Sequence, residues 1–507
     1  MEKKPARKRK TSVLKERASG VLLPIFSLPS PHGVGTMGKA AYDFADFLHA
    51  AGQKIWQVLP LNPTGYGDSP YASFSVFAGN PYFIDIDMLR EEGLLTAEEI
   101  AECDFGSDPR RVDYGKLYET RLPLLRKAME RDDFADRADY AEFLAENEDW
   151  LPDFALFTAL KAHFGGQPWL DWEDKGARLR RAQTLDKYRR LLKDEIKFFE
   201  YTQYLFAKQW KALKAYCNDL GISIVGDIPI YCALDSADAW ANPTQFQLDE
   251  NRRPTLVAGV PPDAFTEDGQ LWGNPLYDWD AMKKDGYGWW IRRFRAAKRL
   301  YDVVRIDHFR GLESYWAVPA GDTTARNGSW LPGPGTDFIR TVRRELPGLA
   351  MIAEDLGYIT PQVAALLRAS RCPGMKVLEF AFQPGAKSNY VPFRHEKNSV
   401  CYIGTHDNSP ILEWKDEFFE DDIGFMKKYL AYTEEEGLCY TMIRGGMESN
   451  ANTFIAQMQD FLELGAGSRI NSPGTNEGNW QWRMLEGEAT AELAAKIRDY
   501  TETYGRI

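Results

Sequence analysis

The sequence predicts an α/β protein built on a (β/α)8 barrel, and three observations lead to this prediction. Short apolar runs recur along the chain, helical patterns separate most of them, and each run ends in polar, glycine or proline residues. Continuous apolar runs are typical of parallel strands that are buried on both faces. About eight such βα units indicate a closed barrel. A doubly wound parallel sheet is the alternative.

Seven of the expected strands follow one another clearly, and an eighth is ambiguous. The seven are SGVLLPIFSLPS, QKIWQVLPL, ISIVGDIPIY, VVRIDH, LAMIAEDLG, MKVLEFAF and VCYIGTHDN. The eighth is either FIAQMQDFLEL or GSRINSPG. Segments such as KAAYDFADFLHAAG and PQVAALLRAS lie between strands, and their helical apolar patterns predict the helices of the barrel.

Three stretches stand outside this alternation. From about residue 85 to about residue 215 the chain is charged and helical, as in TRLPLLRKAMERDDF, and we interpret it as a helical insertion between the second and third strands. A second insertion, at about 240–300, is expected to carry substrate loops. The first 17 residues are basic and are expected to form a flexible tail. The catalytic barrel then takes up residues 18–507.

Composition excludes several kinds of partner. With 62 basic and 74 acidic residues the net charge is −12, which argues against nucleic acid and anionic membranes. No apolar run is long enough to span a bilayer, and the basic N-terminus lacks the apolar core of a secretory signal. Six scattered cysteines without CxxC spacing are typical of reduced thiols. We therefore expect a cytoplasmic protein.

Three carboxylates follow three of the expected strands: Asp307 in VVRIDH, Glu354 in MIAEDLG and Asp407 in GTHDN. Residues i and i+2 of a strand share one face, so Arg305 is expected to point with Asp307 into the barrel mouth and to hold it ionised. Glu354 lies among apolar residues, and burial should raise its pKa, as a general acid requires. A carboxylate nucleophile opposite such an acid suits retaining glycosyl transfer.

These residues also fit other interpretations. Each carboxylate, taken alone, fits an ordinary ion pair at a strand end or a helix cap. His308 and His406, with the neighbouring aspartates, could be metal ligands, but no HExxH or similar spacing supports a metal site. No GxGxxG motif follows a strand, and no P-loop is present. The sequence therefore predicts an enzyme that uses neither a metal nor a cofactor.

Around these residues the chain resembles the 4-α-glucanotransferase family, also called amylomaltases or disproportionating enzymes, a branch of the α-amylase superfamily. The resemblance runs from about Ser19 to Arg483 and covers most of the chain. Its motifs are GYGDSPYASFSVFAGNP, GDIPIY with DSADAW, VAGVPPDAF with GQLWGNPLYDW, VRIDHFRG, IAEDLG, GMKVLEFAF, GTHDN and GNWQWR.

The resemblance implies a role for each candidate residue. Asp307 is the implied nucleophile, Glu354 the acid and base, and Asp407 the stabiliser of the transition state. Arg305, His308 and His406 fall on positions that contact the sugar in the −1 subsite, and Asp227 falls near that pocket. Further implied glucan contacts are Ser69, Tyr71, Asp263, Trp272 and Asn471. The implied substrates are α-1,4-glucan donors and acceptors, namely maltooligosaccharides and amylose.

Three places depart from the family's usual sequence. Ser409 and Pro410 follow GTHDN, where the family usually has Asp-Thr, Glu379 takes the place of a glutamine, and Ala72 replaces the glutamine of SPYQS. None of them is one of the three carboxylates. We therefore expect them to affect the preference for acceptors and not the class of reaction.

Two other functions remain as alternatives. An amylase-type hydrolase usually has a C-terminal β-domain and often a structural calcium ion, whereas only 24 residues follow Arg483 here and no Asp/Asn-rich calcium loop is present. We accordingly expect no C-terminal β-domain. An inactive glucan-binding protein is the second alternative, and the intact Asp307, Glu354 and Asp407 argue against it. The sequence does not predict the oligomeric state.

Overall fold

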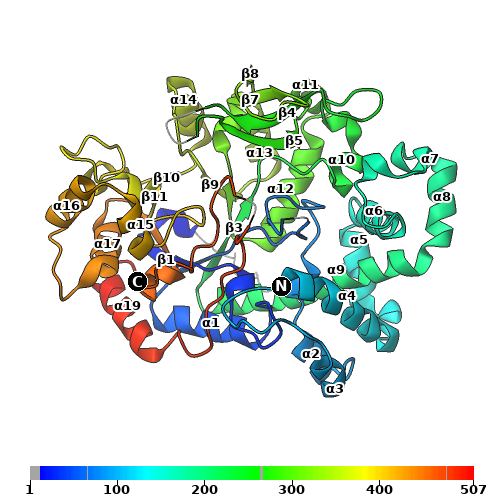
Figure 1. The fold of residues 1–507 in the computed structure, drawn as a ribbon, viewed down its shortest axis with the longest axis horizontal. Helices are drawn as coiled ribbons and strands as arrows, with labels where there is room; N and C mark the ends of the chain where they lie inside the picture. The colour runs from blue at the N-terminus through cyan, green and yellow to red at the C-terminus, as the bar shows by residue number, and fades with distance from the viewer. Residues whose placement is uncertain (1–11, 66, 263–265, 476) are drawn as a thin grey trace, which may run out of the picture.

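The centre of the protein is a closed barrel of eight parallel strands, which confirms the predicted fold and excludes the doubly wound sheet (Figure 1). The computed structural model describes residues 12–65, 67–262, 266–475 and 477–507. Around the barrel the strands follow the order β1-β12-β11-β10-β9-β6-β3-β2. Their bounds are β1 Ala18–Leu22, β2 Ile55–Gln57, β3 Ser223–Ile228, β6 Val303–Ile306, β9 Ala350–Ala353, β10 Gly374–Val377, β11 Ser399–Tyr402 and β12 Thr453–Gln457.

Strand β12 settles the ambiguity of the eighth strand. The first residues of FIAQMQDFLEL form this strand, and the segment then continues as helix α18 (Met458–Phe461). Every residue of β12 is buried, and the strand pairs with β1 on one side and β11 on the other. The other candidate, GSRINSPG, lies in the loop after α18.

A ring of helices covers the outside of the barrel (Figure 1). Every residue of β1, β2, β6, β11 and β12 is buried, as expected for parallel strands that pack side chains on both faces. Helix α1 packs against α9 and α19, and α12 packs against β3 and β6. The ring consists of α1 (Lys39–Ala50), α9 (Lys193–Asp219), α12 (Gly288–Leu300), α13 (Gly335–Glu345), α14 (Pro361–Ser370), α17 (Gly437–Glu448) and α19 (Ala491–Thr503).

The chain between β2 and β3 is helical and extends to one side of the barrel, at the right of Figure 1. Helix α9 packs against α4 and α6 of this segment and also against α1, α12 and β3 of the barrel, so it joins the two parts. We propose that the helices before α9 are the insertion. They are α2 (Ile86–Glu91), α3 (Ala97–Ala101), α4 (Tyr114–Arg131), α5 (Ala138–Glu146), α6 (Leu151–His163), α7 (Lys175–Arg178) and α8 (Ala182–Leu191).

A four-stranded antiparallel sheet lies at the top of Figure 1, in the order β5-β4-β7-β8. It combines β4 (Leu256–Val260) and β5 (Gln270–Pro275), which follow β3, with β7 (Ser314–Pro319) and β8 (Ser329–Pro332), which follow β6. The stretch VAGVPPDAFTEDGQLWGNP belongs to the segment at about 240–300 that is expected to carry substrate loops. The two ends of this stretch form β4 and β5, which pair with each other, and β4 also pairs with β7 on its other side.

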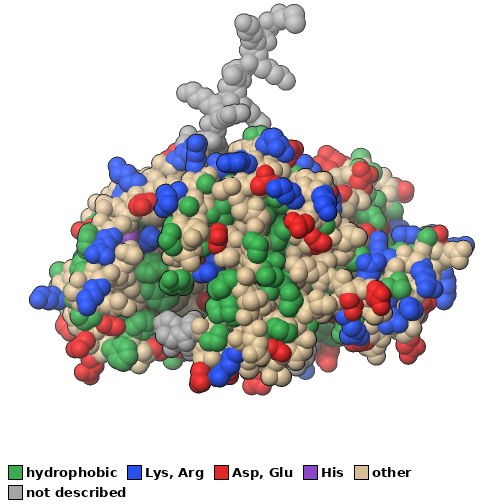
Figure 2. All heavy atoms as spheres, turned by 90° about the horizontal axis from the view of Figure 1, so that it is seen from above, with side chains coloured by type: hydrophobic (Ala, Val, Ile, Leu, Met, Phe, Trp, Pro, Cys, Tyr) green, Lys and Arg blue, Asp and Glu red, His purple; other side chains and the backbone are tan. Residues whose placement is uncertain are grey.

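The remaining helices are short or lie on the surface. They are α10 (Ala237–Ala241), α11 (Trp279–Lys284), α15 (Ile411–Glu417) and α16 (Glu420–Tyr429). None of the described helices is long and apolar enough to cross a membrane. On the face seen in Figure 2, basic and acidic side chains are interspersed, and hydrophobic side chains run across the middle.

The N-terminal segment corrects one expected boundary. Residues 12–17 were placed in a flexible tail, but Leu14 is buried in the core and Arg17 donates hydrogen bonds to three main-chain oxygens. These acceptors belong to Met447, Ser449 and Tyr504, at 2.7–2.9 Å. The arginine thus satisfies carbonyl groups at the ends of α17 and α19. The rest of the expected tail, residues 1–11, lies outside the described part of the chain.

Candidate active site

The three carboxylates line one cleft at the carboxyl ends of the barrel strands, where barrel enzymes place their catalytic groups. Its volume is about 2080 Å³. Asp307 and Glu354 directly follow β6 and β9, and Asp407 lies in the loop after β11. Arg305, His308 and Trp272 line the same cleft. The structure thus brings these candidate residues together from four separate segments of the chain.

Arg305 joins two of the aspartates. Asp227 of β3 pairs in register with Arg305 of β6, so their side chains lie side by side on neighbouring strands. Arg305 Nη1 donates to Asp227 Oδ2 at 2.5 Å and to Asp307 Oδ1 at 3.0 Å. Arg305 and Asp227 are almost completely buried, whereas the Asp307 side chain is 28% exposed. The buried guanidinium therefore orients a carboxylate that remains open to the cleft.

Glu354 is held by two main-chain N–H groups. His308 donates to Oε2 at 2.8 Å and Leu356 donates to Oε1 at 3.0 Å. His308 can reach it because the chain turns sharply after β6, with the histidine in the left-handed conformation at φ 49°. Burial, and then the nearby charge of Asp307, raise the pKa of Glu354 to about 8. At neutral pH this carboxyl group therefore holds a proton that it can donate.

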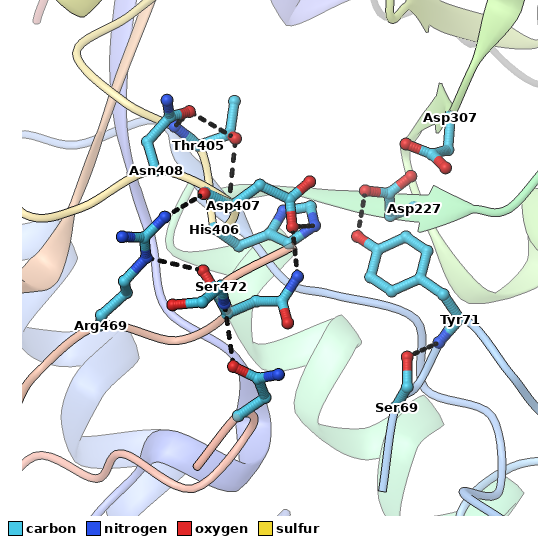
Figure 3. Close-up of polar contacts among 12 residues, drawn as sticks. Ser69, Tyr71, Asp227, Asp307, Thr405, His406, Asp407, Asn408, Arg469 and Ser472 are labelled. Carbon is cyan, nitrogen blue, oxygen red and sulfur yellow. Dashed lines mark hydrogen bonds and ion pairs between the residues drawn. The ribbon is translucent and has the colours of Figure 1, made fainter. Parts of the chain in front are cut away.

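Asp407 is held by neighbours from the loop that follows α18 (Figure 3). Asn471 Nδ2 donates to Asp407 Oδ1 at 2.6 Å, and the Asn471 N–H donates to the carbonyl oxygen of His406 at 3.1 Å. His406 Nε2 lies 3.4 Å from the same Asp407 oxygen. Asn471, which the resemblance placed on the glucan, thus contacts a catalytic candidate directly.

Aromatic and polar side chains form the walls beside the carboxylates. The Tyr71 hydroxyl donates to Asp227 Oδ2 at 2.9 Å, and its ring stacks on His406 with 5.1 Å between centroids (Figure 3). Ser69 Oγ accepts a hydrogen bond from the Tyr71 N–H at 3.2 Å, so it supports that ring. The candidate Asp263 lies outside the described residues.

Trp272 on β5 and His308 after β6 also line the cleft. Their rings meet edge to face with 4.9 Å between centroids, and Trp272 is 37% exposed, so part of its flat apolar ring is open to the cleft. Burial lowers the pKa of His308 to about 4, so its ring is neutral at neutral pH. A neutral imidazole can both donate a hydrogen bond to a hydroxyl group and accept one from it.

Sequence reasoning missed Arg469, which donates from Nη2 to the carbonyl oxygen of Asp407 at 3.0 Å. Arg469 belongs to GSRINSPG, the segment considered as a possible eighth strand. No spacing signal links two loop residues 62 positions apart. Among the described residues, no group of three or more His, Cys, Asp or Glu side chains is arranged to hold a metal ion.

Glu379, one of the departures from the family's usual sequence, is buried beside the Asp407 loop. It is 3% exposed, and its Oε1 has no hydrogen-bond partner in the described part of the structure. A Cβ atom at Gly404 would lie only 2.5 Å from that oxygen. Burial, and then the charge of Asp460, raise the pKa of Glu379 well above its ordinary value. The buried carboxyl group therefore favours its protonated, neutral form.

Glu379→Gln is expected to stabilise the protein at alkaline pH. The raised pKa means that the folded state binds a proton that the unfolded state releases above about pH 4.5, so stability falls as the pH rises from there toward the folded pKa. Each unit of raised pKa corresponds to about 1.4 kcal/mol. Glutamine needs no proton. The gain in melting temperature over wild type should therefore be larger at pH 8 than at pH 5.

The control for this measurement is Glu435→Gln, which changes an exposed glutamate to the same amide. It should leave the melting temperature unchanged at both values of pH. If the gain from Glu379→Gln were equal at pH 5 and pH 8, or absent, the carboxyl group at 379 would not carry the proposed proton.

Known proteins resemble the chain over nearly its full length. The family described as 4-alpha-glucanotransferase matches residues 23–488. The 4-alpha-glucanotransferase of Streptococcus pneumoniae serotype 4 is 49% identical, over 97% of this chain and 98% of its own length. That of Thermus thermophilus is 45% identical, over 97% of this chain and 99% of its own.

Solved structures agree with these relatives. The amylomaltase from Streptococcus agalactiae, solved in complex with acarbose, has a TM-score of 0.94 at 43% identity and covers 97% of this chain and 100% of its own. The amylomaltase from Corynebacterium glutamicum, at 20% identity and a TM-score of 0.76, shares the fold. By the family match and the extent of these identities, the chain belongs to the 4-alpha-glucanotransferase family.

Proposed function

We propose that this enzyme transfers α-1,4-glucan segments from a maltooligosaccharide or amylose donor to the 4-hydroxyl group of an acceptor chain, with retention of configuration. The arrangement of Asp307 and Glu354 is the observation that carries the proposal. The Asp307 carboxylate, which is hydrogen-bonded to the buried Arg305 guanidinium, shares a cleft with Glu354, whose pKa is raised to about 8. Retaining glycosyl transfer requires such a nucleophile and such an acid.

In the first step Asp307 attacks the anomeric carbon of the donor. A bond forms between its carboxylate oxygen and C1, the bond from C1 to the glycosidic oxygen breaks, and the proton of Glu354 moves to that leaving oxygen. The product is a β-linked glycosyl ester of Asp307. Arg305 orients the attacking carboxylate through its 3.0 Å hydrogen bond.

In the second step the acceptor releases the ester. Glu354, now a carboxylate, accepts the proton of the acceptor 4-hydroxyl group, whose oxygen bonds to C1 as the bond to Asp307 breaks. Both steps pass through a transition state in which C1 carries positive charge. Asp407, held by Asn471 at 2.6 Å, is placed beside the sugar to stabilise that charge.

Every proton and bond change in this mechanism is assigned to a side chain of the protein. We accordingly propose that neither a metal nor a cofactor takes part. We also keep the cytoplasmic location as a prediction from the cysteine pattern and the composition. The walls formed by Tyr71 and Trp272 are the proposed contacts with sugar rings.

The experiment that tests the proposed function is incubation of the purified protein with maltotriose, with the products resolved by chain length. Transfer should yield glucose together with maltodextrins longer than maltotriose. Hydrolysis would yield only glucose and maltose, and that result would favour the amylase-type alternative. Transfer prevails only if water is kept away from the glycosyl ester. The ratio of maltodextrins longer than maltotriose to free glucose therefore measures how well the site excludes water. The Asp307→Asn protein, purified in parallel, controls for contaminating enzymes.

A further inference from the structure

We propose that Arg469, Ser409 and Glu417 form a positioning unit that holds Asp407 in its catalytic orientation. We call these three residues the Arg469 cluster. The inference rests on the proposed role of Asp407 as a transition-state stabiliser, and it assigns a function to side chains that lie behind the candidate site. Two of the three, Ser409 and Glu417, come from the end of the Asp407 loop and from helix α15.

Arg469 ties together the two loops that carry Asp407 and Asn471. Figure 3 shows Arg469 beside Asp407. Nη2 donates to the carbonyl oxygen of Asp407 at 3.0 Å, and Nε donates to the carbonyl oxygen of Asn471 at 2.9 Å. The side chains of those two residues are in turn bonded to each other at 2.6 Å. One guanidinium thus fixes the main chain on both sides of the hydrogen bond that orients the Asp407 carboxylate.

The third nitrogen of the same guanidinium is anchored by Ser409 and Glu417. Nη1 donates to Ser409 Oγ at 2.7 Å and lies 3.2 Å from Glu417 Oε1. Ser409 Oγ donates to Glu417 Oε2 at 2.6 Å. Ser409 is buried, whereas the Glu417 side chain is 43% exposed. Glu417, at the end of α15, thus receives hydrogen bonds from both Ser409 and Arg469. Its carboxylate therefore fixes the orientation of the half-buried Arg469 guanidinium.

The position of Asp407 in the fold explains why such support is needed. Asp307 and Glu354 directly follow β6 and β9, and their main-chain N–H groups bond to the neighbouring strand, at Ile228 and Ile306. Asp407 instead comes five residues after β11 ends. Among the described residues, its own N–H bonds only to the side chain of Thr405, within the same loop. Contacts from the loop after α18 therefore replace the support that a strand gives the other two carboxylates.

The first test compares Glu417→Gln and Arg469→Met with Asp416→Asn. Glutamine keeps the shape of Glu417 and removes its charge, while the exposed Asp416 is its neighbour on α15 and makes no described contact. Loss of the outer partners that orient metal ligands typically costs 10–100-fold in metal affinity or activity, and we expect the same scale for groups that orient Asp407. We expect kcat to fall about 10-fold for Glu417→Gln, about 100-fold for Arg469→Met, and not at all for Asp416→Asn.

The kinetic pattern distinguishes positioning from a general structural defect. Because Asp407 acts on the charge at C1 and not on the leaving group, kcat should fall equally with maltotriose and with α-maltosyl fluoride. Loss of an interaction made only in the transition state lowers kcat and kcat/KM together. The melting temperature of Glu417→Gln should match that of Asp416→Asn.

The second test asks whether a second substitution restores the kcat that Glu417→Gln loses. Aspartate at position 409, which is the usual residue of the family there, places a carboxylate beside Arg469 Nη1 without help from Glu417. We expect Ser409→Asp combined with Glu417→Gln to return kcat to within about threefold of wild type. At about 1.4 kcal/mol per tenfold change in rate, threefold is a residual of about 0.7 kcal/mol. Wild-type kcat in Glu417→Gln and Arg469→Met, or a double variant as slow as Glu417→Gln, would overturn the inference.

Asp407→Asn separates this inference from the proposed function on which it rests. If Asp407→Asn is inactive while the variants of the Arg469 cluster keep wild-type kcat, only the positioning inference fails. If Asp407→Asn itself keeps wild-type kcat, the proposed role of Asp407 fails as well. Reduced kcat in both sets of variants, with rescue in the double variant, supports both proposals.

Discussion

Replacement of Asp307 by asparagine is expected to abolish transfer from every α-glucan donor, natural or activated. An amide does not form the glycosyl ester, so neither step of the reaction can proceed. Removal of a catalytic nucleophile lowers kcat by many orders of magnitude, and we expect a loss of at least ~10⁴-fold. The measurement is the initial rate with maltotriose and with α-maltosyl fluoride.

The fold should survive this substitution. Arg305 keeps its 2.5 Å hydrogen bond to the buried Asp227, so the guanidinium is not left unpaired. Melting curves of Asp307→Asn and of the control Asp416→Asn should therefore match that of the wild type. Substantial turnover of the fluoride by a folded Asp307→Asn protein would show that another group is the nucleophile.

Glu354→Gln is expected to fail in a different way. Without protonation of the leaving group, transfer from maltotriose should fall by roughly 10²–10⁴-fold. α-Maltosyl fluoride needs little protonation, because fluoride leaves as a stable anion when the bond from C1 to Asp307 forms. The variant should therefore still form the glycosyl ester from this donor and accumulate it, since activation of the acceptor is also lost.

The pH dependence provides a second test of Glu354. The raised pKa keeps its proton in place below about pH 8, and the group loses that proton as the pH rises through this value. The wild-type kcat/KM for maltotriose should therefore fall on the alkaline side with an apparent pKa near 8. Formation of the ester from the fluoride by Glu354→Gln should lack this fall. If the alkaline limb remained in the variant, another group would be responsible for it.

The sequence alone predicted the barrel and the position of its carboxylates for a clear physical reason. Strands buried on both faces must be almost entirely apolar, so a charged residue at the end of such a run is conspicuous. Asp307 and Glu354 were found in this way because each directly follows a fully apolar or nearly apolar strand. Even the eighth strand was among the two candidates, since β12 is fully buried and its central residues Phe454, Ile455 and Ala456 are apolar.

The contacts behind the site could not be predicted in the same way. Arg469, Ser409 and Glu417 meet only because two long loops and the end of α15 adopt particular conformations, and no periodic pattern encodes such meetings. The pairing of β4 with β7 joins segments that follow different barrel strands. Burial of Leu14 likewise depends on the surface that the folded barrel offers.

The most direct test of the central claim is to locate the covalent intermediate. Glu354→Gln is mixed with α-maltosyl fluoride, quenched in acid and examined by intact-mass spectrometry and peptide mapping. The mechanism predicts one maltosyl adduct per protein, on the peptide that contains Asp307. The double variant Asp307→Asn with Glu354→Gln should carry no adduct. An adduct on the peptide that contains Asp407, or on the residue at position 354, would contradict the assignment of Asp307 as the nucleophile.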